Sequence, residues 1–178
     1  MSPEELDRWL PDAQLRSHHR RAASADADVL WHAAESVRLD ETGTLGRLVR
    51  WRIPGTPGSR PFRDLLREYP FVVLDEGQRW SLSGLAGRIW TLQRDYPRLN
   101  GADAWCAWDE PGTVRVLFGH WVEGDDAERP ELVSEARVAA TDVRGAARLR
   151  ALWSVVGHFE RLIGAEPLAA AARRAERS

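Results

Sequence analysis

The sequence predicts an α+β domain in which an antiparallel sheet packs against a long C-terminal helix. Residues 71–140 are rich in β-branched and aromatic residues and are interrupted by short turn sequences, a pattern typical of consecutive antiparallel strands. Residues 143–163 instead repeat apolar residues at helical spacing, with arginines on the opposite side. The chain has 178 residues, a length for which one domain with a sizeable core is the usual outcome.

The N-terminal part is predicted to contain one strand between two helices. A capping-box start with proline in the first turn predicts a short helix over residues 3–10, within an N-terminal helical extension of residues 1–12. Pro11 ends this helix. A strand over residues 14–23 is expected next, because this segment lies between a proline and a new helix start. Apolar residues at helical spacing then predict a helix up to about Leu39.

Short helices and the strands of the sheet are expected to follow. The turn sequences Asp75-Glu76-Gly77 and Asp109-Glu110-Pro111-Gly112 each separate two apolar segments, and the second turn marks the clearest hairpin in the chain. With residues 14–23, the sheet has about seven strands. The predicted elements are a helix or turn at residues 45–49, a helix at residues 61–69, and strands at residues 71–74, 78–85, 88–93, 102–108, 113–123 and 131–140.

The C-terminal region is predicted to form one long helix and one short helix. Asp142 is suited to cap the helix over residues 143–163. Gly164 is expected to end that helix, and Pro167 to lie in the first turn of a separate short helix over residues 165–178. One helix covers only part of the inner face of a sheet this large, so a cleft between helix and sheet is expected.

Local strings, together with this order of elements, carry a resemblance to a known family. They are His-His-Arg-Arg at residues 18–21 leading into residues 25–31, Arg-Leu-Val-Arg-Trp-Arg-Ile-Pro-Gly at residues 47–55, and Ser-Glu-Ala-Arg-Val-Ala-Ala-Thr-Asp at residues 134–142. The chain resembles bacterial members of the START-like, or SRPBCC, superfamily, which has the helix-grip fold and includes polyketide cyclases and aromatases, lipid-transfer domains and ligand carriers. The resemblance spans most of residues 14–163. It implies a single START-like domain over residues 1–178, with an apolar cavity between sheet and last helix and without metal or tightly bound cofactor.

Composition excludes several kinds of chemistry. All 25 basic residues are arginine, so Schiff-base chemistry and the P-loop lysine are excluded. Cys106 is the one cysteine, which excludes an internal disulfide and a multi-cysteine zinc cluster. His18 and His19 are adjacent and point to opposite faces of a strand, and the chain has no HExxH pattern, so we expect no metal site.

Net charge and hydropathy bear on the cellular location of the protein and on its possible partners. The formal net charge of −2 gives no general attraction to nucleic acid, and we expect no nucleic-acid partner. No apolar run reaches the roughly 18 residues of a membrane-spanning helix. We therefore expect a cytoplasmic protein, as a monomer or homodimer. The resemblance implies that its partner is a small hydrophobic molecule.

His120 is the candidate for chemistry in the cavity. It shares one strand face with the apolar residues Val114, Val116, Phe118 and Val122, because side chains alternate along a strand. If that face lines the cavity, His120 is a polar group among apolar ones and could orient a ligand or transfer protons. The alternative is a strand-end histidine that hydrogen-bonds locally.

The remaining candidates would line the cavity or anchor an anion. Ser134, Ala136 and Val138 suit the inner face of the last strand, which leaves Glu135 and Arg137 outside as an ion pair. In the reversed register, Arg137 would be an anion anchor at the cavity. Trp105 and Trp108, three apart on a predicted strand, would face opposite ways. The predicted ligand-binding residues are Trp80, Trp108, Phe118, His120, Trp153 and Val156.

Three functions are open at this point. The first is a non-catalytic carrier or sensor that binds a small hydrophobic or aromatic ligand in the cavity. The second is an enzyme of the cyclase, aromatase or dehydratase kind, in which His120 acts as acid and base. The third is a protein-interaction module, since the resemblance extends to domains that activate chaperone ATPases.

Overall fold

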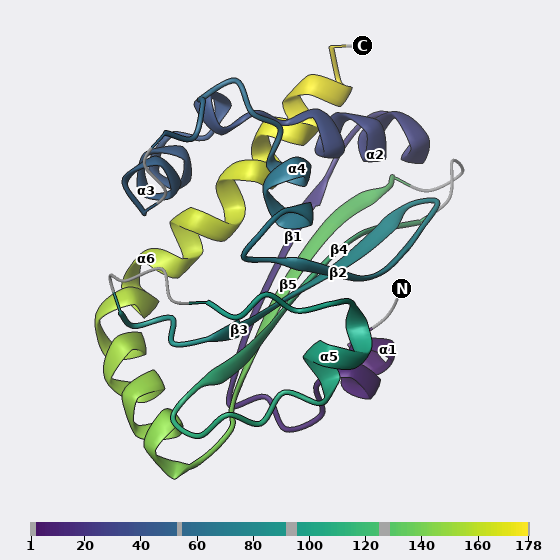
Figure 1. The fold of residues 1–178 in the computed structure, drawn as a ribbon. Coiled ribbons are helices and arrows are strands. Elements are labelled where there is room, and N and C mark those ends of the chain that lie inside the picture. The colour runs from purple at the N-terminus through teal and green to yellow at the C-terminus, as the bar shows by residue number, and fades with distance from the viewer. Residues whose placement is uncertain (1–2, 53–54, 92–95, 125–128, 178) are drawn as a thin grey trace.

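The computed structural model describes residues 3–52, 55–91, 96–124 and 129–177, with the side chains of residues 3–4, 52, 155–156 and 158–163 excepted. Helices and strands alternate in blocks along the chain (Figure 1). In chain order they are α1 (Pro3–Trp9), β1 (Leu15–Ala22), α2 (Ala27–Ser36), the 3-10 turn η1 (Leu39–Glu41), α3 (Thr44–Arg52), α4 (Phe62–Arg67), β2 (Val72–Gly77), β3 (Trp80–Gly87), α5 (Ala102–Cys106), β4 (Val114–Glu123), β5 (Glu131–Ala140) and α6 (Val143–Ala175).

The strands form one antiparallel sheet in the order β1-β5-β4-β3-β2, so β1 and β2 are its edges. This confirms the predicted α+β class and the antiparallel sheet, and the arrangement is consistent with a helix grip. The prediction of about seven strands is wrong, because the sheet that the described residues form has five.

Residues 102–108 and 88–93 account for the two missing strands. Residues 102–106 form the helix α5, since alanine favours a helix and no strand among the described residues pairs with this segment. β3 ends at Gly87, whose φ of 129° is a conformation that residues with a side chain rarely adopt. The described residues 88–91 after it contain no strand, and residues 92–93 lie outside the described part of the chain.

Two helices, α1 and α5, cover one face of the sheet, which we call the outer face. Leu6 of α1, Leu10 directly after α1 and Trp105 of α5 are fully buried there, in a cluster that includes Leu82 and Leu117. Glycines on the strands make room for these helices. A Cβ at Gly84 would lie 2.7 Å from the Trp105 indole nitrogen, and one at Gly119 would lie 3.3 Å from Leu6. The part of the outer face under α1 and α5 is therefore closely packed.

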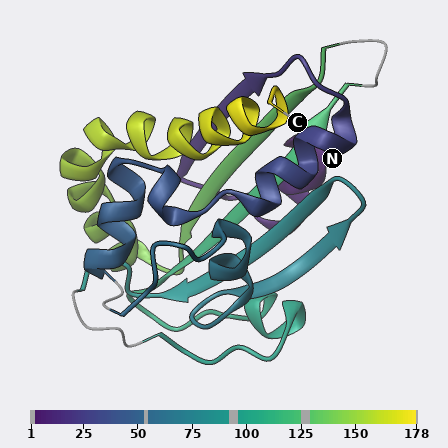
Figure 2. The ribbon, with the colours of Figure 1, turned by 90° about the horizontal axis from the view of Figure 1, so that it is seen from above.

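The opposite face, the inner face, lies under α6 and α2 (Figure 2). Leu30 of α2 and Val37, the residue that caps the end of α2, pack with Leu168 and Ala171 of α6 in a second buried cluster. The prediction that Gly164 ends the long helix is wrong, because α6 continues as one helix of 33 residues with Pro167 inside it. Interior proline costs about 3 kcal/mol in a helix, and burial of the alanine-rich end against α2 offsets that cost.

Caps on α6 and α3 fix the position of the cover over the inner face. The predicted cap of α6 is confirmed, since the Asp142 carboxylate accepts a hydrogen bond of 2.7 Å from the Gly145 amide. Glu166 of α6 accepts hydrogen bonds from the amides of Thr44 and Leu45, at 2.9 and 2.8 Å. These two amides begin α3, and a carboxylate is favourable at a helix N-terminus. Glu166 therefore fastens α3 to α6.

Candidate functional site

A cavity of about 400 Å³ lies between the inner face of the sheet and α6. Alternate residues of the strands form its floor, as period-two alternation requires. Side chains from α3, α4, α6 and the segments after β3 form its cover. The floor residues are Leu15, Ser17 and His19 of β1, Val138, Ala136 and Ser134 of β5, Val116, Phe118 and His120 of β4, and Leu85 of β3. The cover includes Leu45, Phe62, Ile89, Tyr96, Trp153, Gly164, Pro167 and Leu168.

Three of the residues proposed for ligand binding lie on this cavity. Phe118 and His120 share its floor with Val116, so the predicted strand face of β4 does line it. Trp153 of α6 lies on the cover. Phe118 also makes an edge-to-face contact with Phe71, with ring centroids 5.7 Å apart, which fixes the orientation of its ring.

Trp80 and Trp108 lie elsewhere, on the outer face. Both are partly buried and pack against the cluster under α1 and α5. Trp80 shares its face with Leu82, and the Trp108 indole N–H donates to the Thr113 hydroxyl at 3.0 Å. The prediction for Trp108 assumed a strand that is a helix in the structure. The side chain of Val156, the remaining candidate, lies outside the described residues.

His120 presents its imidazole to the cavity. Burial lowers the pKa of His120 from 6.5 to about 4, so the ring is neutral at pH 7. The ring packs edge-on against Phe62, with centroids 6.1 Å apart. No hydrogen bond joins the ring to another residue in the part of the chain that the structure describes, and the residue is only partly buried because it borders the cavity. A ligand or water in the cavity is therefore its available partner.

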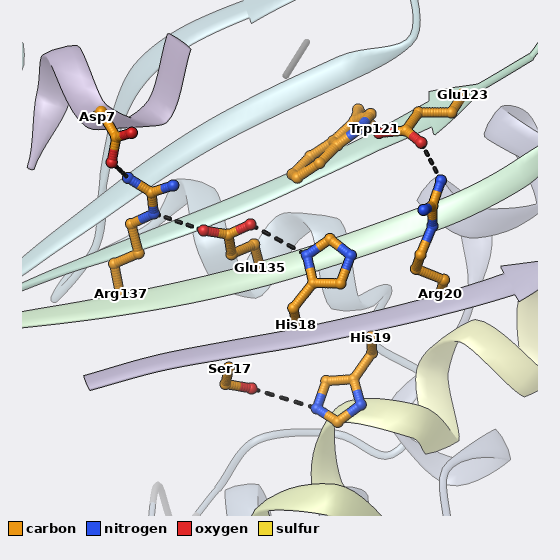
Figure 3. Close-up of polar contacts among 9 residues, drawn as sticks. All are labelled: Asp7, Ser17, His18, His19, Arg20, Trp121, Glu123, Glu135 and Arg137. Carbon is orange, nitrogen blue, oxygen red and sulfur yellow. Dashed lines mark hydrogen bonds and ion pairs between the residues drawn. The ribbon is translucent and has the colours of Figure 1, made fainter. Parts of the chain in front are cut away.

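His19 is a cavity residue that the sequence reasoning missed. Its ring nitrogen Nε2 lies 3.2 Å from the Ser17 hydroxyl, and both residues line the cavity. Figure 3 shows His18 and His19 on opposite sides of β1, as adjacent strand residues must be. The alternation of Leu15, Ser17 and His19 was the available signal, but basic neighbours hid it.

Arg137 lies on the outer face, away from the cavity, in a chain of polar contacts (Figure 3). Its guanidinium donates to Glu135 and to Asp7 of α1, each at 2.5 Å, and Glu135 also contacts His18 at 3.0 Å. The hydrogen bond from Arg137 lowers the pKa of Asp7. The predicted pair of Glu135 and Arg137 is confirmed, and the reversed register is not observed.

Burial distinguishes this pair from the exposed pair that was expected. Arg137 is 0% exposed and Glu135 is 5% exposed, because α1 covers this part of the sheet. The sequence places α1 before the sheet but does not show which face it covers. Arg137 therefore binds α1 to the sheet through Asp7 and does not reach the cavity.

A smaller hollow of about 50 Å³ adjoins the cavity. Phe62, His120, Pro167 and Leu168 line both spaces, so His120 stands at their junction. Ser81 of β3 is one of the polar residues of the smaller hollow.

The described residues form no group of three or more His, Cys, Asp or Glu side chains placed to hold a metal ion. None of the described helices has the length and hydropathy needed to cross a membrane.

Comparisons with protein-family models and with curated protein sequences find no match to this chain. Among solved structures, the crystal structure of the Zhui aromatase/cyclase from Streptomyces sp. R1128 aligns with 90% of this chain and 94% of its own chain. The sequence identity is 16% and the TM-score is 0.35. A TM-score this low carries no argument, so function has to be argued from the cavity and its lining residues.

Proposed function

We propose that this protein binds a small, mainly apolar molecule in the cavity between sheet and α6, as a non-catalytic carrier or sensor. The observation that carries the proposal is the cavity itself, at about 400 Å³. Protein cores are close-packed and leave few voids larger than a water molecule, whereas ligand pockets measure about 300–1,000 Å³. Its lining of apolar side chains with a few polar ones is the usual composition of such pockets.

A variant that fills the cavity tests the proposal. Ala136 lies on the cavity floor, between Phe118 of β4 and Ser17 of β1, so Ala136→Phe places a ring inside the cavity. Ala165 is exposed on α6, and Ala165→Phe is the matched control. We expect neutral aromatic compounds to stabilise the wild type and the control against heat, and not Ala136→Phe.

Native mass spectrometry of protein purified from its source provides a second test. A small molecule that co-purifies with the wild type and is absent from Ala136→Phe would identify the ligand. If the purified wild type carries no molecule and no compound of a lipophilic library raises its melting temperature, the proposal is wrong.

His120 favours one alternative, an enzyme of the cyclase, aromatase or dehydratase kind. Its imidazole faces the cavity without a hydrogen-bond partner among the described residues, as an acid-base group awaiting a substrate would. Its pKa of about 4 makes it a weak base, since proton transfer is most efficient with a pKa near the working pH. We therefore prefer the non-catalytic carrier or sensor to the enzyme as the proposed function. Turnover of a bound ligand that is lost in His120→Phe, with binding retained, would reverse this preference.

A further inference from the structure

A row of polar side chains crosses the inner face of the sheet. Ser81 of β3 pairs with His120 of β4, His120 pairs with Ser134 of β5, and Ser134 pairs with His19 of β1. Paired residues on neighbouring antiparallel strands point to the same face. His19, Ser134 and His120 line the large cavity, and Ser81 lines the smaller hollow. We call these four residues the polar row.

The row four residues further along the strands is entirely apolar. It consists of Leu85, Val116, Val138 and Leu15, which pair across the same four strands. Four residues of strand span about 13 Å. The floor therefore changes, over about this length, from hydrocarbon at one end to hydrogen-bonding groups at the other.

The helix α6 runs along the same direction above the floor. Leu149 of α6 packs in one cluster with Val116 and Val138, and Trp153 follows one helical turn later. At the other end, Gly164 lies over the polar row, because a Cβ at this position would be 2.2 Å from the His19 ring. The long axis of the cavity therefore runs along α6, from Trp153 to Gly164.

Charges near the cavity are neutralised within the protein. Every charged Arg or Glu side chain described as lining either space has an oppositely charged partner. Within the polar row, the serines carry no charge and His120 is neutral at pH 7. An ion in an apolar cavity without a counter-charge is costly. The pairs are Arg16 with Asp7 at 3.0 Å, Arg63 with Glu35 at 2.7 Å, and Arg67 with Glu76.

From these observations, and resting on the proposed binding function, we infer that the ligand is an uncharged amphipathic molecule. Its hydrocarbon end lies between Val116, Val138 and Trp153. A hydroxyl or carbonyl oxygen at its other end hydrogen-bonds to His120 and Ser134 of the polar row. A neutral imidazole and a serine hydroxyl can each donate and accept a hydrogen bond, so they can bind either a hydroxyl or a carbonyl oxygen.

Three probes of one ring system test this inference by calorimetry: naphthalene, 2-naphthol and 2-naphthoate. We expect 2-naphthol to bind about 3- to 10-fold more tightly than naphthalene, the range of one or two neutral hydrogen bonds. The naphthoate anion should bind more weakly than 2-naphthol. In His120→Phe and Ser134→Ala the preference for 2-naphthol should fall to less than about 2-fold, with naphthalene affinity retained.

Ser83→Ala is the matched control for Ser134→Ala. Ser83 is buried on the same face, but lines the smaller hollow and not the cavity. Its preference for 2-naphthol should equal that of the wild type. If all three probes bind and the preference is absent, favours the anion, or survives in both His120→Phe and Ser134→Ala, the inference is wrong while the binding function stands. If no probe binds, the proposed function fails and the inference fails with it.

Discussion

Replacing Arg137 with methionine should destabilise the protein far more than replacing an exposed arginine. Methionine keeps much of the apolar stem of arginine but removes its charge and its N–H donors. Arg137 is fully buried and contacts the carboxylates of Glu135 and Asp7. Glu135 is itself almost completely buried, so the substitution leaves a carboxylate in the interior without its permanent cation.

The size of the effect follows from this burial. Removing one partner of a buried ion pair costs about 3–5 kcal/mol, because the other charge stays buried and uncompensated. Neutralising both partners in Arg137→Met/Glu135→Gln removes that penalty and should recover about 2 kcal/mol of the loss. Arg88 pairs with Glu110 at 3.5 Å on the surface, with both side chains about half exposed. Arg88→Met should therefore cost less than about 1 kcal/mol.

Urea denaturation at pH 7 measures these differences. The free energy of unfolding is compared for the wild type, Arg137→Met, the double variant and Arg88→Met, with the slope against urea checked for each protein. The reasoning is refuted if Arg137→Met loses no more stability than Arg88→Met. It is also refuted if the double variant is less stable than Arg137→Met.

Two further predictions concern His120 and Gly164. In the unfolded chain His120 is protonated below about pH 6.5, whereas in the folded protein it is protonated only near pH 4. The free energy of unfolding should therefore fall as the pH falls from 6.5 to 4. Between pH 7 and 4.5 the free energy of unfolding of the wild type, measured by urea titration, should fall by about 2–3 kcal/mol more than that of His120→Phe. If the difference between the two proteins is the same at both pH values, the prediction is wrong. Gly164→Ala pushes a Cβ against His19 and should lower stability by about 1 kcal/mol after the gain in helix propensity. Gly43→Ala, whose Cβ would meet only Glu166 at 3.6 Å, should stay within about 0.5 kcal/mol, and equal losses in the two variants would exclude a steric cause.

The faces of β4 and β5 could be predicted from the sequence because alternation alone determines them. Val116, Phe118 and His120 point one way, and Glu135 and Arg137 point the other, once each segment is recognised as a strand. The burial of Arg137 could not be predicted in this way. It depends on α1 returning to cover the outer face, a long-range contact with no local signal.

Two of the predictions are wrong because the same type of residue can serve two different structural purposes. Gly164 was interpreted as a helix end, whereas it is glycine because His19 lies against it and leaves no room for a Cβ. Residues 102–108 are predicted as a strand because a turn sequence separates them from the next strand, yet Trp105 projects from α5 into the space above Gly84. In both cases the packing partner is distant in the sequence, so local preferences pointed to the wrong element.

The two edges of the sheet have a consequence for solubility. An edge strand exposes unpaired backbone groups that can recruit a strand from another molecule. β1 carries Arg16, Arg20 and Arg21 along one edge. At the other edge, the pairing of β2 with β3 is irregular between Val73 and Asp75. Charged side chains and a bulge are both known deterrents to edge-to-edge aggregation, so we expect the arginines of β1 to discourage strand addition at this edge of the sheet that the described residues form.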